Sequence, residues 1–360
     1  MGAYGAYHRG HCPCHRPEGI PVRIGITYLS VSPTVDRESA REKYREFLRQ
    51  VEWAGGHDFA GIWITEHHFS GYSLSASPLL LLTRAAAAAS TLRIGTGILV
   101  LPLWDPVRLA ADLGTLDTLS DGRLDIGIGR GYQPHEFQGF GRALDTSRER
   151  FEEAADLLVR LLEGPVDSYA GAYHCVDAPV TVLPRPVQTP RPPVWLAAVS
   201  HESTRFAVRR GFHLLGLALA TPAELAQQWR TAQDLAAAEN TGTEGLEYGV
   251  NRFVYCGTDP DARRAAAREV ARQIQTSRAL AQGAVPDGGL PPLPTRVDPA
   301  DEALAAERLL AGSPDEIRKQ LAELADVGVT QVNAAFEYGA LPAETAHASL
   351  RLFAKEVLPL

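Results

Sequence analysis

The sequence is poor in cysteine and has no long apolar run. Its 360 residues contain only four cysteines, two near the N-terminus and two in separate segments, so no disulfide framework is expected. The most apolar stretch, residues 79–89, is short and is interrupted by Arg84, which predicts a buried helix rather than a membrane span. The N-terminus lacks the apolar segment and small-residue cleavage site of a signal peptide. Together these absences predict a cytoplasmic protein.

Basic residues are also outnumbered. Lysine and arginine total 35 against 43 aspartates and glutamates, which gives a formal net charge of −8. This balance argues against nucleic acid or an anionic membrane surface as the main partner, although it is compatible with a local basic pocket for a phosphate. The 45% hydrophobic content is that of an ordinary globular protein, and a chain of this length can bury a large core without disulfides.

The chain divides into a short extension and one long patterned region. Residues 1–20 are rich in glycine, histidine, proline and tyrosine without periodicity, and we expect a flexible extension there. Their segment 11–15, His-Cys-Pro-Cys-His, groups potential metal ligands. No distant second pair completes the spacing of a zinc site, so no metal site is predicted. Residues 21–360 are expected to form a single domain.

Within that region, short apolar segments alternate with segments of helical periodicity. The pattern predicts strands at residues 22–28, 60–65, 92–101, 123–128, 194–199, 213–216, 248–256 and 329–336. It predicts helices at residues 36–55, 78–89, 106–119, 147–162, 202–210, 222–238, 259–274, 314–327 and 343–357. These make about eight βα units, the number that an α/β fold of the (β/α)8 TIM barrel type needs, with an open doubly wound sheet as the alternative.

Two segments interrupt this alternation. Residues 169–193 are rich in proline and short apolar patches, which predicts an excursion over the surface. Residues 275–305 contain several glycines and a proline-rich middle, which predicts a mobile lid.

Polar clusters follow four of the predicted strands. They lie at residues 66–68, 102–105, 129–132 and 200–203. Because α/β barrels carry their chemistry on the loops that follow the C-terminal ends of the strands, these clusters are expected to share one rim. The sequence therefore predicts an active site on that rim.

The cluster Glu66-His67-His68 combines a carboxylate with two imidazoles. Histidine titrates near neutral pH, so a histidine on the rim can act as a general base or hydrogen-bond a developing anion. A metallohydrolase site is a weaker interpretation, because adjacent residues of an extended chain point in opposite directions and a zinc-binding helix needs its histidines four residues apart. The structural alternative is one histidine capping a strand end and the other on the surface.

A second candidate site would hold an anion. Residues 127–131 fail the dinucleotide fingerprint, because the third glycine would fall at Tyr132, but they leave Arg130 available to a phosphate. Ser200 and Ser203 open a predicted helix, whose free N–H groups and dipole attract anions, although simple N-capping is the alternative role for both hydroxyls. Arg130 and the two serines therefore predict a phosphate clamp.

Taken in order, these and further motifs resemble the luciferase-like flavin monooxygenases. The resemblance covers roughly residues 21–360, and its motifs are specific when they occur together. They lie at residues 64–69, 94–97, 100–102, 105–108, 119–124, 127–131, 140–141, 193–195, 312–314 and 336–337.

That resemblance implies a (β/α)8 barrel, usually dimeric, that acts on a small organic substrate with molecular oxygen and reduced FMN (FMNH2). A separate NAD(P)H:flavin reductase would deliver the reduced FMN, and one oxygen atom would enter the substrate by hydroxylation or Baeyer–Villiger-type insertion. Two other functions stay open. One is an F420-dependent hydride transferase on the same barrel, and the other is a non-catalytic flavin-binding partner subunit.

The resemblance also implies roles for residues around the flavin ring. His67 matches the catalytic histidine, and Glu66 and His68 flank it at the flavin edge. Gly97-Ile98 matches a position where the family often has a non-proline cis peptide bond beneath the ring, so both residues are expected to bind the cofactor. The light-emitting luciferases have a cysteine where this chain has Gly129, which leaves more room beside the ring and predicts a non-luminous member.

The remaining implied roles concern the phosphate of the flavin. Arg130, Ser200 and Ser203 match positions that hold this phosphate, which agrees with the clamp inferred from the residues themselves. Gly131 is expected to bind the cofactor beside them. The segment 275–305 sits where bacterial luciferase has its mobile lid.

Overall fold

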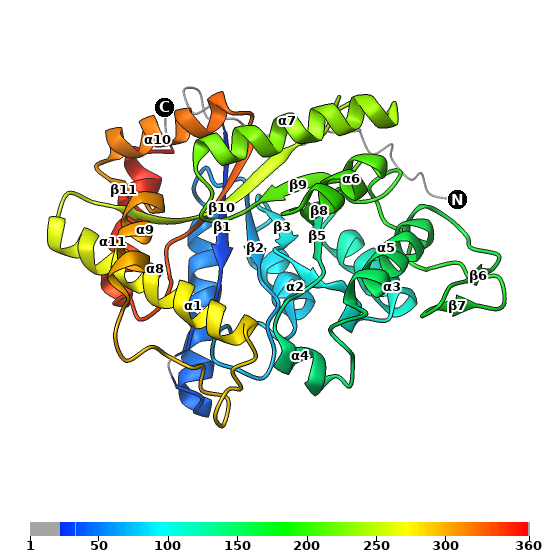
Figure 1. The fold of residues 1–360 in the computed structure, drawn as a ribbon, viewed down its shortest axis with the longest axis horizontal. Helices are drawn as coiled ribbons and strands as arrows, with labels where there is room; N and C mark the ends of the chain where they lie inside the picture. The colour runs from blue at the N-terminus through cyan, green and yellow to red at the C-terminus, as the bar shows by residue number, and fades with distance from the viewer. Residues whose placement is uncertain (1–21, 33, 359–360) are drawn as a thin grey trace, which may run out of the picture.

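The backbone closes into a barrel of parallel strands (Figure 1). The computed structural model describes residues 22–32 and 34–358. The barrel strands, in spatial order, are β1 (Arg23–Tyr28), β2 (Gly61–Ile64), β3 (Arg93–Thr96), β5 (Leu124–Gly129), β8 (Val194–Ala197), β9 (His213–Gly216), β10 (Tyr248–Cys256) and β12 (Gln331–Ala335). The last strand pairs with the first, with Val332 opposite Ile24. The predicted (β/α)8 barrel is therefore confirmed, and the open-sheet alternative is wrong.

Helices surround the barrel in the predicted positions. They are α1 (Arg37–Ala54), α2 (Pro78–Ala88), α3 (Pro106–Leu119), α5 (Ser147–Glu163), α6 (His201–Arg209), α7 (Pro222–Glu239), α8 (Pro260–Ala281), α10 (Pro314–Asp326) and α11 (Ala343–Glu356). Several begin at a capping side chain, such as Asp36 before α1 and the reciprocal pair Ser313 and Glu316 at α10. None of the helices described is both long and apolar enough to span a membrane.

The predicted strand at residues 92–101 is wrong in its length. After β3 the peptide bond between Gly97 and Ile98 is cis, and the chain continues as the short strand β4 (Leu99–Val100) and a 3-10 turn, η1 (Leu101–Leu103). Both β3 and β4 pair with β5, which leaves the irregular bond between them at the mouth of the barrel. Apolar alternation alone does not reveal such a break.

The predicted lid is wrong in its extent. Helix α8 continues through residue 281, because its buried residues, including Ala267, Val270 and Leu280, recur at helical spacing. A further helix, α9 (Pro299–Arg308), packs against α8. Only residues 282–298 between them are without a helix. The backbone of this segment contacts the loop after β2, where the Gly71 N–H donates to the Gly289 carbonyl at 2.7 Å. Mobility of this segment stays a prediction.

Other elements were not predicted. The surface excursion contains a small hairpin, β6 (Tyr169–Ala170) with β7 (Cys175–Val176). Strand β11 (Leu310–Gly312) extends the pairing of β10, and the short helix α4 (Pro134–Gly139) follows β5. Of these elements, α4 matters most for the site described below. The extension at residues 1–20 lies outside the described residues.

Two indole rings fill the interior of the barrel. Trp63 on β2 and Trp195 on β8 meet edge to face, with ring centroids 5.6 Å apart. Glycines on the neighbouring strands make room for them, because a Cβ on Gly95 would lie 2.6 Å from the ring of Trp63 and one on Gly249 would lie 3.1 Å from that of Trp195. The barrel is therefore packed below its mouth, and the loops at the strand ends are left to form the site.

Candidate active site

The four polar clusters lie at the C-terminal ends of neighbouring strands, as the sequence predicts. Residues 66–68 directly follow β2, residues 102–105 follow β4, residues 129–132 end β5, and residues 200–203 begin α6 after β8. Strands β2, β3, β5 and β8 are consecutive neighbours in the barrel, and β4 pairs with β5. The clusters therefore occupy one arc of the rim.

His67 lies at the centre of this arc. Its Nδ1 is 3.0 Å from Oε1 of Glu136, and the edge of the His67 ring faces the ring of Tyr72, with centroids 4.8 Å apart. Its side chain is 12% exposed. Among the residues that the structure describes, none hydrogen-bonds to its Nε2. The pairing places the ring proton on Nδ1 and leaves the Nε2 lone pair available to a ligand.

Glu136 holds His67 from the short helix α4. Its side chain is only 1% exposed, and its Oε1 also accepts the backbone N–H of His68 at 2.8 Å. Burial by itself would raise the pKa of Glu136, but hydrogen bonds from His67 and the His68 N–H hold the pKa below its usual value. Glu136 is therefore an ionised, buried carboxylate whose two protein partners both belong to the 66–68 cluster.

Glu66 and His68 are occupied by contacts within the protein. Glu66 is 2% exposed, and its Oε2 accepts the Val100 N–H at 2.7 Å. The indole N–H of Trp104 lies 3.0 Å from both oxygens of Glu66, and Nε2 of His68 lies 2.7 Å from Oε1. The pair thus ties the loop after β2 to β4 and η1. This geometry gives both residues a positioning role beside His67.

A chain of polar contacts joins His67 to helix α8. Nε2 of Gln133 donates to the hydroxyl of Tyr132 at 3.2 Å and lies 3.3 Å from Nδ1 of His67, a contact rather than a hydrogen bond because the Nδ1 proton points to Glu136. That hydroxyl lies 3.0 Å from Oγ of Ser277 on α8. The helix that precedes residues 282–298 therefore contacts the loop beside the histidine.

The expected phosphate site has one free cation and one capped helix. Arg130 is exposed, and no ion pair or hydrogen bond joins it to another residue of the described chain. Ser200 Oγ accepts the Ser203 N–H at 3.2 Å, and Ser203 Oγ accepts the Ser200 N–H at 2.9 Å. The N-capping alternative for the serines is thus what the structure contains. The helix start still attracts anions. Its own first turn carries Glu202, whose pKa is lowered by its backbone N–H and the Ser200 hydroxyl.

Register places Arg130 beside this helix start. Strands β5 and β8 pair with Ile128 opposite Leu196, so the residues just beyond each strand are neighbours. A cavity of about 620 Å³ opens next to Ser200, between α6, α7 and the loop 217–220. Buried Arg252 shapes that loop by donating to the carbonyls of Ala218 at 2.6 Å and Ala220 at 2.7 Å.

Gly129 does not open space at the mouth. A Cβ at this position would lie 2.8 Å from Cδ1 of Ile98, so the side chain of Ile98 already fills the room beside the glycine. The expectation of extra room is therefore wrong, because the side chain of Ile98 lies against β5. The cis bond itself lies where the resemblance to the luciferase-like flavin monooxygenases implies it.

Comparison with known proteins decides the family. The family model described as luciferase-like monooxygenase matches residues 22–331. The chain belongs to the luciferase-like monooxygenase family. Its barrel superposes on the crystal structure of monooxygenase RslO1 from Streptomyces bottropensis with a TM-score of 0.81 and 27% identity, over 94% of this chain and 99% of RslO1.

Two curated proteins illustrate the relationship. The chain is 35% identical over 193 residues to the uncharacterized protein y4vJ of Sinorhizobium fredii, covering 54% of this chain and 55% of y4vJ. It is 29% identical over 186 residues to the oxygenase component of a flavin-dependent trigonelline monooxygenase from Acinetobacter baylyi, covering 51% of each chain. The matched segments thus span about half the length of these two relatives.

Sequence reasoning missed the residues that lie beside His67 and Tyr132. Glu136 and Gln133 lie 69 and 66 positions beyond His67, and Ser277 lies 145 positions beyond Tyr132. One local signal was available for Glu136, because Pro134 is a residue typical of the first turn of a helix and places a carboxylate just after the glycine-rich strand end.

Proposed function

We propose that this protein is the oxygenase component of a two-component flavin monooxygenase. It would use reduced FMN and molecular oxygen to place one oxygen atom in a small organic substrate, by hydroxylation or Baeyer–Villiger-type insertion. The observation that carries the proposal is His67 at the mouth of the barrel, with Nδ1 bound to buried Glu136 and no described residue hydrogen-bonded to Nε2. The family match and the printed activity of the trigonelline enzyme support it.

The residues present fit a flavin mononucleotide. Arg130 offers a guanidinium that no described residue engages, and the adjacent Gly131 has φ of 76°, a conformation that brings backbone N–H groups toward a ligand. The start of α6 at Ser200 and Ser203 supplies the second side of the phosphate site. Reduced flavin bound there would supply the electrons that activate oxygen.

The protein residues would then manage a proton and exclude water. Glu136 keeps the His67 proton on Nδ1, so Nε2 can accept a hydrogen bond or take a proton from the reacting group and return it. Glu66 and His68 fix the loop that carries His67. Residues 282–298, held to Gly71 by the Gly289 carbonyl, would cover the mouth while oxygen is transferred.

The test is a single turnover of the full-length protein with photoreduced FMN and oxygen. The wild type should release hydrogen peroxide more slowly than free reduced FMN does, and it should incorporate label from ¹⁸O₂ into members of a panel of cyclic ketones, terpenes and N-heterocycles. His67→Ala should lose at least about 100-fold of this oxygen transfer, as removal of a general acid–base group does. His57→Ala, an exposed histidine at the end of α1, is the matched control.

Three results would contradict the proposal. Oxygen transfer that is unchanged in His67→Ala under saturating reduced FMN would remove His67 from the reaction. Hydride transfer with F420 and no oxygen consumption would favour the F420-dependent alternative. No turnover by the purified chain with any donor would favour a flavin-binding partner subunit. Light scattering on the same sample tests the expected homodimer, and addition of an NAD(P)H:flavin reductase tests the expected electron donor.

A further inference from the structure

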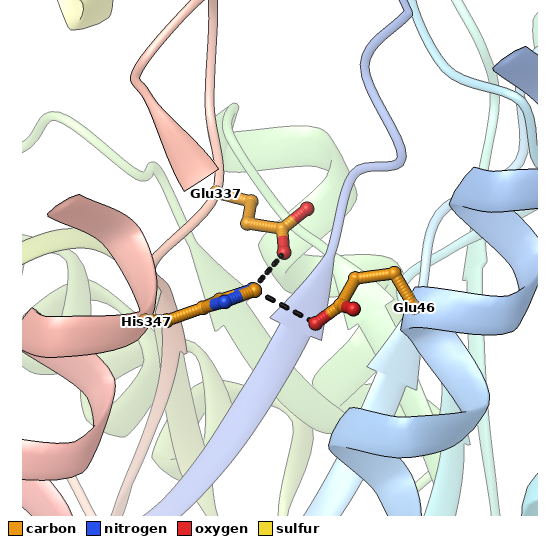
Figure 2. Close-up of side chains that lie close together, drawn as sticks. All are labelled: Glu46, Glu337 and His347. Carbon is orange, nitrogen blue, oxygen red and sulfur yellow. Dashed lines mark ion pairs between the residues drawn. The ribbon is translucent and has the colours of Figure 1, made fainter. Parts of the chain in front are cut away.

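A second group of chemically reactive side chains lies away from the mouth of the barrel. Glu46 on α1, Glu337 just after β12 and His347 on α11 point toward one another (Figure 2). One ligand atom of each lies within 4.8 Å of the others. The first and last βα units of the chain meet here, since β1 pairs with β12. The side chains are only 21%, 15% and 24% exposed, in the same order.

The separations between these atoms match a metal's coordination shell. Oε1 of Glu46 lies 2.8 Å from Nε2 of His347, and Oε1 of Glu337 lies 3.4 Å from the same nitrogen. Four ligands held tetrahedrally at bond lengths of about 2.0 Å are about 3.3 Å apart. The amide of buried Gln50 supplies a fourth group, with Nε2 3.1 Å from both the Glu46 oxygen and the His347 nitrogen and in contact with Oε1 of Glu337.

Hydrogen bonds link these groups when no cation is bound. The two amide hydrogens of Gln50 go to the carboxylates of Glu46 and Glu337, and Nε2 of His347 can donate to Oε1 of Glu46 at 2.8 Å. A cation at the centre would take the place of these protons. Each inner carboxylate oxygen and the imidazole nitrogen would offer it a lone pair, and Gln50 would offer its amide oxygen after a half-turn of the amide.

Surrounding charges favour the ionised form of the ligands. Arg49 donates to Oε2 of Glu46 at 2.6 Å, and Lys43 lies 3.6 Å from Oε2 of Glu337. Each base thus engages the outer oxygen and leaves Oε1 facing inward, which is how outer partners orient the ligands of metal sites.

A cavity gives access to the group. It measures about 480 Å³ and is lined by all three residues together with Ser39, Lys43 and Tyr338. Oε2 of Glu337 is buried, and no group of residues 22–32 or 34–358 hydrogen-bonds to it. A metal ion can therefore reach the ligands without unfolding of the barrel.

We propose that Glu46, Glu337 and His347, with Gln50 as the fourth ligand, form a zinc-binding site that links the first and last βα units of the barrel. The imidazole favours zinc over magnesium and calcium, which prefer ligand sets made only of oxygen. The site lies outside the proposed active site and does not depend on the proposed function.

The test must separate this site from the Cys- and His-rich segment at residues 11–15. All measurements therefore use the full-length chain with Cys12→Ser and Cys14→Ser, freed of metal by a chelator. Calorimetric titration with Zn²⁺ should give one equivalent per chain. Glu337→Gln and His347→Asn should each weaken the affinity by more than about 100-fold, beyond the loss typical of outer-sphere changes. Glu42→Gln, on the same helix and cavity wall but outside the group, should bind as the parent does.

Two further measurements keep the proposal open to refutation if a variant fails to fold. Co²⁺ bound to the parent should give the intense visible bands of four-coordinate cobalt, and Zn²⁺ should raise the Tm of the parent but not that of a folded ligand variant. Six-coordinate cobalt, no Zn²⁺ uptake at micromolar concentration, or uptake unchanged by both ligand variants would each overturn the site.

Discussion

Replacing Glu136 by glutamine tests the pairing on which the proposed mechanism depends. The substitution keeps the shape of the side chain and removes its charge. In the native protein the carboxylate accepts the Nδ1 proton of His67 at 3.0 Å and the backbone N–H of His68 at 2.8 Å. An amide can donate to Nδ1 as well as accept from it, so Glu136→Gln frees the ring to adopt the opposite tautomer.

The size of the effect follows from the strength of a charge-assisted hydrogen bond. Such a bond contributes about 1.5–3 kcal/mol, and a neutral amide replaces only part of it. At 1.36 kcal/mol for each factor of ten, loss of the full bond in the transition state lowers kcat/KM by roughly 10- to 150-fold. Binding of reduced FMN should change little, because Glu136 is buried and lies on the protein side of His67.

The assay is the single-turnover measurement with photoreduced FMN, read as the rate of peroxide release and the yield of oxygenated product. Glu136→Gln should release peroxide faster and form less product, while Glu136→Asp, which keeps the charge, should recover part of the yield. Exposed Glu149→Gln on α5 is the matched control. If Glu136→Gln behaves as Glu149→Gln does in both readouts, the pairing does not control the reaction and the assignment of His67 loses its main support.

Three further perturbations test other features of the molecule. Arg130→Ala should weaken the binding of reduced FMN by roughly 10- to 150-fold in an anaerobic fluorescence titration. Arg130→Lys should fall between Arg130→Ala and the wild type, since lysine keeps the charge but not the bidentate guanidinium. Equal affinities would remove Arg130 from the phosphate site. Gly127→Ala should lower the free energy of unfolding by about 3 kcal/mol or more, because its Cβ would lie 1.9 Å from the Thr96 carbonyl oxygen. Gly164→Ala is the control, since its Cβ would meet nothing within 4 Å and the free energy of unfolding should hardly change. Equal midpoints of the two variants in a denaturant titration would contradict this packing. Burial lowers the pKa of His213 from 6.5 to about 4, so the unfolded chain binds a proton in this range that the native state does not. The free energy of unfolding should therefore fall by about 3 kcal/mol as the pH drops from 7 to 4. The fall should be less steep in His213→Asn. Parallel curves of the free energy of unfolding against pH for the two proteins would refute the lowered pKa of His213.

The sequence by itself determined the features that depend on local pattern. Alternating strand and helix periodicities predicted the number of βα units, and Ser200 marked where the helix after β8 begins. The order of the strands then placed residues 66–68, 129–132 and 200–203 on one rim, because every parallel strand of a barrel ends on the same side. These properties depend only on neighbours within a few positions along the chain and on a general rule of the fold.

The tertiary structure decided which side chains meet on that rim. Glu66 looked like a catalytic carboxylate in the sequence, but Val100 and Trp104, 34 and 38 positions away, occupy both of its oxygens. No sequence motif indicated a role for Glu136, yet closure of the barrel brings its carboxylate to His67. Gly129 suggested open space, which Ile98 fills.

The group at Glu46, Glu337 and His347 is the extreme case. Helix α1 is far in sequence from the other two members, since its Gln50 lies 287 positions before Glu337 and 297 before His347, and no spacing rule connects them. They meet because β12 pairs with β1 in one register, which is fixed by the packing of the whole barrel. Local sequence patterns do not predict that register, because it is set by the sum of many weak contacts between distant elements. The sequence therefore specified where chemistry is possible, and the closed barrel selected the pairs of residues that can perform it.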